Sequence, residues 1–551
     1  MKPLIPFKIR FVILLSLFCL IFLVIWFYLF NLQVLKSSGL TLRLKHQLNQ
    51  NANTLRGDIR DRYGNLLVLD VVEYDVYINI KNINKISKDE IQALAEALND
   101  KPDNLEIKLR QKNFTKIYPI ISQSKKEEIK KLNLDFIYFE QKPTRKYPHK
   151  YFASHILGFV NNDHKGQHGV EYFYESILTK PEENKDKTIA YPKGKSIVLT
   201  IDSILQQYCE NKLNETIKKS KAEKGAIIVL SPKTGEIYSF ASYPDYDPNK
   251  FYKEKNTKNW AITDIYEPGS TFKIVTVSSA LENNTITKDS TYFDPGYLEV
   301  SKRRIHNHEK TKPRTIGLLD LFRHSSNVAA AQVGLTMQPE QFYTSIKNFM
   351  FGQKTNIDLP GESSGLLIDH KQWRKIDLAT TAIGQGAISV TPIQIAAAVS
   401  VIANHGLWIQ PHVLKGLWEP NYNLVIENPF MITQEQAITP ETADFVSGLL
   451  KQSVKENLEA MAYIAGNVPG YEVAGKTGTA QKIKLPGQGK GYWPGHTIAS
   501  FIGYFPADNP EILILVVVDD PKTEGRWGNT IAGPVFNEVA KMAAERLLED
   551  N

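Results

Sequence analysis

Ser270 and Lys273 stand three residues apart in a segment that could perform nucleophilic catalysis. Pro268-Gly269 stops the incoming chain, and the residues after Lys273 are apolar on nearly every side, which predicts a buried helix. Side chains three positions apart share a helix face, so the Lys273 amine can reach the Ser270 hydroxyl. Burial favours the neutral amine, which can accept the serine proton, and a helix N-terminus stabilises developing negative charge. This segment is therefore a candidate serine nucleophile with a lysine base.

The spacing of a serine and a lysine does not by itself identify an active site. Ser122-Gln-Ser-Lys125 repeats it in a lysine-rich stretch, which we interpret as ordinary exposed surface. Taken alone, Ser270 is as readily explained by a structural role at the start of a helix. Other motifs have to decide between the two interpretations.

A second candidate, Ser325-Ser326-Asn327, lies in a loop between helix-like segments over 317–323 and 328–336. Serine and asparagine are preferred helix caps, so this motif alone is better explained as a cap.

A third candidate, Lys476-Thr477-Gly478-Thr479, lies in a strand-like stretch of small residues. Small side chains leave room for another backbone, as at a sheet edge that receives an extended peptide. Lys233-Thr234-Gly235 carries the same tripeptide in a predicted hairpin turn, where ordinary turn chemistry explains it. As single tripeptides the two cannot be separated.

The three motifs together are much more specific than any one of them. A Ser-x-x-Lys at a buried helix start, a Ser-x-Asn between helices and a Lys-Thr-Gly on a strand form a set found in penicillin-binding proteins and serine β-lactamases. The chain resembles the class B penicillin-binding proteins, the monofunctional D,D-transpeptidases of bacterial cell-wall synthesis, over nearly all of its length after residue 30. Further segments that carry this resemblance are Arg56-Gly-Asp-Ile-Arg-Asp61-Arg62-Tyr-Gly64, Arg145-Lys-Tyr147-Pro148, His155, Gly158, Gly166, Gly169, Glu171, Gly384-Gln385-Gly386 and Thr391-Pro392-x-Gln394.

The resemblance implies a mechanism without a metal or an organic cofactor. Ser270 would attack the carbonyl of the penultimate D-alanine of a stem pentapeptide, with Lys273 as the base. An amine of a neighbouring stem peptide would then resolve the acyl-enzyme and form a crosslink, and penicillins would acylate Ser270 as substrate mimics. The remaining implied roles are a proton relay at Ser325 and Asn327, electrostatic support from Lys476, carboxylate binding at Thr477 and Thr479 beside Gly478, and an oxyanion hole from the backbone N–H groups of Ser270 and Thr479.

The pattern of elements predicts an α+β fold. Apolar strands over 226–230 and 236–241, and over 498–505 and 511–519, form two antiparallel hairpins. The resemblance implies a penicillin-binding/serine β-lactamase-like transpeptidase domain over 196–551, with an antiparallel sheet flanked by helices and an all-helical lobe. Helices are predicted near 205–217 and after Pro534.

An elongated α+β pedestal domain, of the kind associated with dimerisation, is implied over 56–195. In it the sequence predicts strands over 73–80 and 135–140 and helices over 88–98 and 124–132. A polar stretch over 31–55 is interpreted as a stalk or linker. The charged, proline-bearing stretch over 180–195 marks the boundary between the two domains.

Residues 11–30 contain no charged side chain and are long enough to span a bilayer, so we expect a transmembrane signal anchor. Residues 1–10 would form a short cytoplasmic tail. Because the bulk of the chain follows the anchor, we expect a single-pass protein of the cytoplasmic (inner) membrane with a periplasmic or extracellular catalytic domain. The expected partners are lipid-linked or polymeric stem peptides, β-lactam antibiotics, a membrane glycan polymerase and other division-complex proteins.

Composition excludes several other classes. The chain has 551 residues, of which 42% are hydrophobic and 23% charged, so neither a disordered chain nor a multi-span membrane protein fits. Two cysteines exclude a disulfide framework or a cysteine-rich zinc site. The net charge of +7 is modest for this length, and we expect no nucleic-acid partner.

Several alternatives within and beyond the family stay open. The stretches over 499–506 and 517–521 resemble the septal, division-type enzymes, and an elongation-type transpeptidase is the nearest alternative. A serine β-lactamase would typically be shorter and lack the anchor and pedestal, whereas a penicillin-sensing receptor would need several membrane spans. A bifunctional class A enzyme would need a glycosyltransferase domain where the pedestal motifs stand. A catalytically inactive division scaffold is disfavoured by the intact serine and lysines.

Overall fold

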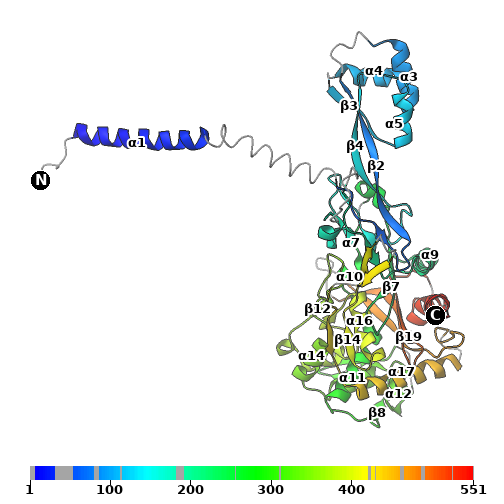
Figure 1. Cartoon of the computed structure of the whole chain (residues 1–551). Helices are drawn as coiled ribbons and strands as arrows, with labels where there is room; N and C mark the ends of the chain where they lie inside the picture. Colours follow the sequence, from blue (N-terminus) through cyan, green and yellow to red (C-terminus); the bar gives the residue numbers. More distant parts are fainter. Residues whose placement is uncertain are drawn as a thin grey trace. The chain divides into compact units, whose positions relative to one another are not determined.

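The computed structural model describes residues 7–30, 54–79, 86–111, 114–181, 192–254, 256–308, 312–419, 424–427, 430–459, 464–484, 491–523 and 525–549. The chain forms two compact units (Figure 1). The smaller unit comprises residues 1–55, 72–143 and 181–194, and the larger one comprises 56–71, 144–180 and 195–551. Most of the predicted stalk, over 31–53, and most of the charged boundary stretch, over 182–191, lie outside the described residues.

The smaller unit packs helices on a short antiparallel sheet. Strand β2 (Leu66–Asn79) pairs with β3 (Phe114–Ile121), with Tyr74 opposite Ile121 and Asn79 opposite Phe114, and also with β4 (Ile137–Lys146). Leu94, Leu98 and Leu105 join Ile117 in one buried cluster. The helices of this unit are α3 (Lys88–Leu98), α4 (Pro102–Gln111) and α5 (Gln123–Lys130). The helices predicted here are confirmed, and the strand predicted over 135–140 lies over Ile137–Lys146.

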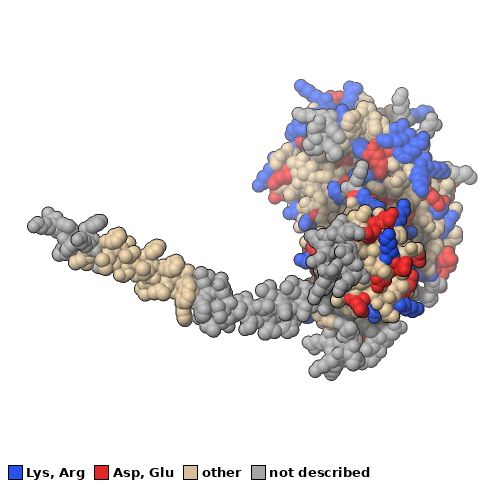
Figure 2. Space-filling view, turned by 90° about the horizontal axis from the view of Figure 1, so that it is seen from above, with Lys and Arg blue, Asp and Glu red and all other residues tan. Residues whose placement is uncertain are grey.

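Helix α1 (Phe7–Phe30) contains the apolar stretch singled out in the sequence. Figure 2 shows its described part in the colour of uncharged residues, whereas basic and acidic side chains are mixed over the rest of the visible surface. Within the described part of the chain, no helix meets the length and apolarity required to cross a membrane.

The larger unit is built on a five-stranded antiparallel sheet in the order β18-β19-β20-β6-β7. Side chains alternate along each strand, so Ile228 and Leu515 enter one core whereas Ile227 and Val516 enter another. Because both faces are covered, all eight residues of β20 are buried. The strands are β18 (Ala474–Ile483), β19 (Tyr492–Phe505), β20 (Ile512–Asp519), β6 (Lys224–Leu230) and β7 (Ile237–Tyr243).

Helices cover the two faces of this sheet. Helix α9 (Ser203–Ser220) and helix α18 (Gly528–Ala544) share a core with one face, and α11 (Lys273–Glu282) and α16 (Pro392–Ala403) share a core with the other. The remaining helices of the lobe that contains α11 are α12 (Leu318–Arg323), α13 (Asn327–Gly334), α14 (Pro339–Asn348), α15 (Lys375–Thr381) and α17 (Pro440–Glu459). The predicted antiparallel sheet, flanking helices and helical lobe are confirmed.

The prediction that the last helix follows Pro534 is wrong. Helix α18 begins at Gly528, so Pro534 lies inside it. A proline within a helix loses the backbone hydrogen bond that its own nitrogen would make, and its ring clashes with the carbonyl four residues earlier, but packing of the apolar face can outweigh this cost. Ala532, Phe536 and Val539 supply that packing, since all three are fully buried.

The motif residues of the Arg56 and Arg145 segments meet in the larger unit as a buried ion network. Arg56 donates from Nε to Glu171 at 3.0 Å and pairs with Glu175 at 2.7 Å, whereas Arg145 pairs with Glu171 at 2.6 Å and with Asp70 at 3.2 Å. Arg56 and Glu171 are at most 1% exposed. Buried charges have to be paired in this way, so these residues fix where the segments around 56 and 145–171 join.

Short elements complete the larger unit. They are β1 (Ile59–Arg60), β5 (Ile197–Leu199), β8 (Tyr292–Asp294), β9 (Tyr297–Val300), β10 (Arg303–His306), β11 (Arg314–Ile316), β12 (Leu366–Leu367), β13 (Ile388–Ser389), β14 (Leu407–Ile409), β15 (Leu414–Glu419), β16 (Leu424–Glu427), β17 (Gln434–Gln436), α6 (Ser154–Leu157), α7 (Gly169–Phe173), α8 (Glu175–Leu178), α10 (Trp260–Thr263), the 3-10 helices η3 (Pro248–Lys253), η4 (Gly269–Phe272) and η5 (His370–Gln372), and the π-helical turn η6 (Glu545–Glu549).

Candidate active site

Ser270 lies in the 3-10 turn η4, and Lys273 is the first residue of helix α11. Every residue of α11 from Lys273 to Ala280 is buried, which confirms the buried helix predicted from the sequence. Ser270 remains partly accessible, as a nucleophile has to be. The turn therefore leaves the serine accessible to solvent and buries the lysine, which lies three residues further along the chain.

Lys273 is fully buried and its amine is surrounded by oxygen atoms. Its Nζ donates to the Ser325 carbonyl at 2.6 Å, to Ser325 Oγ at 3.2 Å and to Asn327 Oδ1 at 2.7 Å. Three acceptors match the three N–H donors of an ammonium group. The second motif is therefore in direct contact with the lysine of the first.

The Ser325-Ser326-Asn327 turn caps a helix and also contacts Lys273. Ser326 caps helix α13, because its hydroxyl accepts from the Ala329 N–H at 3.0 Å. Ser325 has the left-handed backbone angle φ of 51°, which turns the chain sharply before the helix starts. Asn327 is the first helical residue, and its amide reaches Lys273 while Ser326 holds the helix end.

Strand β18 brings the third motif against the first. A Cβ atom on Gly478 would come within 2.9 Å of Thr271 Cγ2, and one on Gly269 would come within 3.0 Å of the Thr479 carbonyl oxygen. Gly269 also has a positive φ of 58°, so both space and backbone geometry require glycine there. Strand β18 is the edge strand of its sheet, and an edge leaves backbone groups available to an extended peptide.

Lys476 is a second buried lysine, with 1% of its surface exposed. Its Nζ donates to the Thr477 carbonyl and to Thr477 Oγ1, both at 3.2 Å. The Thr479 hydroxyl accepts from the backbone N–H of Gly528, at the start of α18, at 3.1 Å. Both threonine side chains of the third motif are thereby held in fixed positions.

Burial lowers the pKa of both lysines and so favours their neutral forms. It lowers the pKa of Lys476 to about 7. Burial also lowers the pKa of Lys273 well below its usual value, the charge of Lys476 lowers it further, and the carboxylate of Asp294 opposes the shift. A neutral Lys273 amine is thus accessible far below the pH at which an exposed lysine loses its proton.

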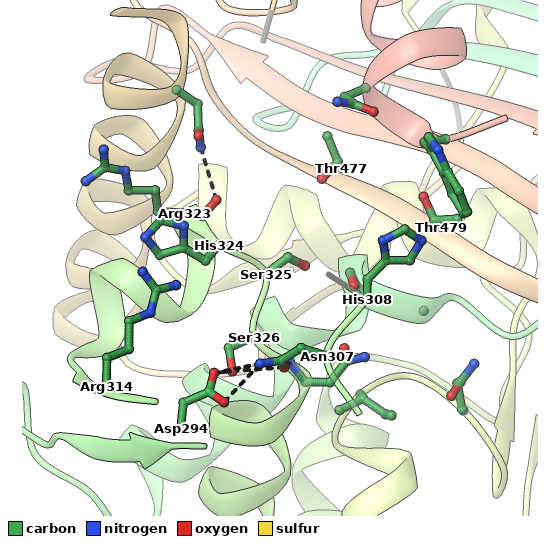
Figure 3. Close-up of a pocket in the computed structure, with 18 residues that line it drawn as sticks. Asp294, Asn307, His308, Arg314, Arg323, His324, Ser325, Ser326, Thr477 and Thr479 are labelled. Carbon is green, nitrogen blue, oxygen red and sulfur yellow. Dashed lines mark hydrogen bonds between the residues drawn. The ribbon is translucent and has the colours of Figure 1, made fainter. Parts of the chain in front are cut away.

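These groups open into a cleft of about 430 Å³. Figure 3 shows Ser325 near its centre, with Arg323, His324 and Arg314 on one side and Thr479 and His308 on the other. The predicted residues Ser270, Ser325, Asn327, Thr477 and Thr479 line the cleft. Lys273, Lys476 and Gly478 are buried. The three motifs are brought together as their combination predicted.

Sequence inspection missed most of the remaining cleft residues. Gln385 lies in a segment already matched to the family, whereas the others come from loops and from the ends of short strands and helices, which carry no local signal. The missed residues are Asp294, Asn307, His308, Arg314, Arg323, His324, Ile383, Asn457, Trp527 and Asn529. Among the described residues, no group of three or more His, Cys, Asp or Glu side chains is placed to hold a metal ion.

The two duplicate motifs have ordinary structural roles. Ser122 caps helix α5 in the smaller unit, where its Oγ accepts from the Lys125 N–H at 3.2 Å. Lys233 lies in the turn between β6 and β7, where its Nζ donates to Asn509 Oδ1 at 2.8 Å and pairs with Glu511. The structure therefore distinguishes the cleft motifs from Ser122–Lys125 and Lys233–Gly235, which have the same residue types at the same spacing.

Comparison with known proteins gives a consistent result. Residues 225–541 match the family model of the penicillin-binding protein transpeptidase domain, and residues 51–197 match that of the penicillin-binding protein dimerisation domain. Stage V sporulation protein D of Bacillus subtilis is 34% identical over 88% of this chain and 77% of its own length. Peptidoglycan D,D-transpeptidase FtsI of Buchnera aphidicola is 30% identical over 99% of this chain and 96% of its own length.

Solved structures show the same similarity. The crystal structure of penicillin-binding protein 3 from Mycobacterium tuberculosis in complex with aztreonam has a TM-score of 0.70 and 25% identity, covering 90% of this chain and 96% of that one. Penicillin-binding protein 2X from Streptococcus thermophilus shares the fold, with a TM-score of 0.76 at 24% identity over 90% of this chain and 80% of that one.

Proposed function

Because this chain belongs to the class B penicillin-binding proteins, we propose that it is a serine-type peptidoglycan D,D-transpeptidase that crosslinks stem peptides through an acyl-enzyme. The observation that carries this proposal is the buried Lys273 amine, held by Ser325 and Asn327 one helical turn from the accessible Ser270. Formation of a crosslinked product from a pentapeptide donor and an amine acceptor tests it, with loss of product in the Ser270→Ala variant as the expected result.

In the first step, Ser270 Oγ is the nucleophile and neutral Lys273 is the base. The serine proton moves to Lys273 Nζ while Oγ attacks the carbonyl carbon of the penultimate D-alanine. The C–N bond to the terminal D-alanine breaks, and that amine takes up a proton as it leaves. Ser325 and Asn327 hold the lysine amine and, through the Ser325 hydroxyl, offer a path for that proton.

In the second step, an amine of a neighbouring stem peptide attacks the acyl-enzyme. The new amide bond forms, the ester bond to Ser270 Oγ breaks, and the serine recovers its proton. No water need enter this exchange, which is what distinguishes a transpeptidase from a hydrolase.

The third motif binds the substrate. Thr477 and Thr479 bind the carboxylate of the terminal D-alanine beside Gly478, and Lys476 supports them electrostatically. The backbone N–H groups of Ser270 and Thr479 form the oxyanion hole, where preorganised donors stabilise charge as it develops. A β-lactam carries a carboxylate and a strained amide, so it can occupy the same groups and acylate Ser270.

We assign this activity to the division septum. The segments over 499–506 and 517–521 resemble septal enzymes, and the Buchnera relative is named peptidoglycan D,D-transpeptidase FtsI. An elongation-type role is the alternative. Depletion in the source cell separates the two, because filaments indicate a septal role and rounded cells an elongation role.

Acylation is expected to slow as the pH falls, because the base has to be neutral. Protonation of Lys273 removes its acceptor lone pair, and burial together with Lys476 places the pKa of this amine well below its usual value. Measured with a fluorescent penicillin, the acylation rate constant should rise with pH through one acid limb. It should reach its plateau at a pH far below the pKa of an exposed lysine. A rate constant that rose only near the pKa of an exposed lysine would contradict the assignment of Lys273 as the base.

Residues 11–30 serve as the membrane anchor in this proposal, with 1–10 as the cytoplasmic tail, 31–55 as the stalk, 56–195 as the pedestal domain and 196–551 as the external catalytic domain. The support is the uncharged stretch within α1. The anchor and the Arg56–Gly64 segment would contact a membrane glycan polymerase and other division-complex proteins. Tethering raises the local concentration of such partners and of lipid-linked substrate.

Replacing residues 1–30 with a cleavable signal peptide should preserve penicillin binding but fail to support growth. The catalytic domain would remain intact while its tether is lost. Complementation of a depletion strain measures growth, and labelling of the secreted protein measures the active site. Full complementation by the soluble protein would contradict the anchoring role, and reporter fusions active only in the cytoplasm would contradict the orientation.

A further inference from the structure

We propose that Asp294 is a positioning residue of this active site, which holds the Ser325–Asn327 turn against Lys273 and opposes the positive charge of Lys476. The inference builds on the proposed function, since it concerns the base of the acylation step. Asp294 ends strand β8 and is fully buried, and neither its position nor its neighbours in the sequence predict a role.

Asp294 holds the turn through hydrogen bonds that saturate its carboxylate. Its Oδ2 accepts from Ser326 Oγ at 2.6 Å and from Asn307 Nδ2 at 2.8 Å. Its Oδ1 accepts from Asn307 Nδ2 at 2.9 Å and from the Gly296 N–H at 2.8 Å. Figure 3 shows Asp294, Asn307 and Ser326 as one connected cluster beneath Ser325.

Asn307 connects Asp294 to Asn327, the residue that contacts Lys273. Its Oδ1 accepts from the backbone N–H groups of Asn327 and Val328, at 2.9 and 3.2 Å. The preceding carbonyl, of His306, accepts from Asn327 Nδ2 at 2.9 Å, which leaves Asn327 Oδ1 turned towards Lys273. The path from Asp294 through Asn307 therefore fixes the backbone of Asn327, and the His306 carbonyl fixes which atom of the Asn327 amide meets the lysine amine.

Asp294 also acts on Lys273 through its charge. Among the described residues, two charged side chains shift the pKa of Lys273: Lys476 on β18 lowers it and Asp294 on β8 raises it. Neither makes a hydrogen bond to Lys273 that the structure shows, so both act through space in a buried, weakly screened site. Neutralising Asp294 leaves Lys476 unopposed, and Lys273 then loses its proton at lower pH.

The test is the pH dependence of acylation in Asp294→Asn, measured with a fluorescent penicillin on the full chain. The acid limb should move to lower pH by about one pH unit, because one opposing charge is gone. The plateau rate constant should fall about tenfold, because an amide has one acceptor oxygen where the carboxylate has two, so its NH2 group would face hydrogen-bond donors in this cluster. A residue with only a structural role would lower the plateau and leave the midpoint in place, and an unmoved midpoint, or one moved to higher pH, overturns the charge effect.

Asp358→Asn is the matched control. Asp358 is also buried and accepts from Tyr174 OH at 2.7 Å and from the N–H groups of Val413 and Leu414 at 2.7 and 2.8 Å. Its substitution should lower the melting temperature without moving the acid limb. A midpoint that moved equally in this variant would attribute the shift to destabilisation and overturn the proposal.

Asn307→Ala tests the positioning role separately and keeps it testable if Asp294→Asn fails to fold. This variant retains the Asp294 charge but cuts the path to Asn327, so acylation should fall about tenfold with an unmoved midpoint. Wild-type acylation in Asn307→Ala overturns the positioning role. If the wild-type chain itself were not acylated at Ser270, the proposed function would fail instead, so the two failures are distinguishable.

Discussion

Ser270→Ala is expected to abolish covalent labelling by a fluorescent penicillin, whereas the variant should keep its fold. Alanine removes the only atom that forms the ester bond, so no later step can compensate. Ser270 is partly accessible in a 3-10 turn, and alanine is compatible with the backbone there. Gel fluorescence measures the label, and circular dichroism checks the fold. Ser270→Cys is expected to lose labelling as well, because the amine geometry that activates a hydroxyl does not carry over to a larger sulfur atom.

Ser122→Ala is the matched control for this result. It removes the other serine that stands three residues before a lysine, but that serine caps α5. We expect a loss of about 1 kcal/mol in helix-cap stability and unchanged labelling. Persistent labelling of the Ser270→Ala variant would move the nucleophile to another residue and overturn the mechanism.

Short-range patterns predicted much of this site. The apolar residues after Lys273 predicted a buried helix, and the small residues around Gly478 predicted a strand open to close approach, because both features depend on neighbours in the sequence. The sequence predicted that the Ser325–Asn327 turn lies between helices and, from this motif alone, that it caps a helix. Ser326 caps α13 and Asn327 contacts Lys273, and this assignment of roles depends on the contact with α11.

Long-range contacts explain what the sequence did not predict. Asp294 and Asn307 lie in a segment of short strands whose periodicity is weak, and their role appears only when they meet the α12–α13 turn. Helix α18 starts before Pro534 because its first turn packs on β18, where a Cβ atom on Gly528 would come within 2.4 Å of the Gly478 carbonyl oxygen. Local propensity at a proline could not predict that contact. The ion network of Arg56 and Arg145 likewise joins segments more than a hundred residues apart.

Lys476→Ala is expected to cut the acylation rate constant by about two to three orders of magnitude. The buried amine donates to Thr477 Oγ1 and to the Thr477 carbonyl, so its loss removes a restraint on the side chain that we propose binds the substrate carboxylate. Its charge also lowers the pKa of Lys273. Removing that charge keeps Lys273 protonated to higher pH, so the acid limb of acylation should move to higher pH, opposite to the shift expected for Asp294→Asn.

Lys233→Ala provides the comparison for this loss, because it changes the same residue type in the same Lys-Thr-Gly tripeptide. Lys233 is exposed in the β6–β7 turn, and its contacts with Asn509 and Glu511 are surface contacts that contribute about 0–1 kcal/mol to stability. Acylation and its pH profile should match those of the wild type. The two variants are measured side by side with the same fluorescent penicillin, and equal effects would show that Lys476 has no special place beside Ser270. A large loss of acylation rate in Lys476→Ala alone would show that the role of Lys476 depends on its burial and position, not on the tripeptide itself.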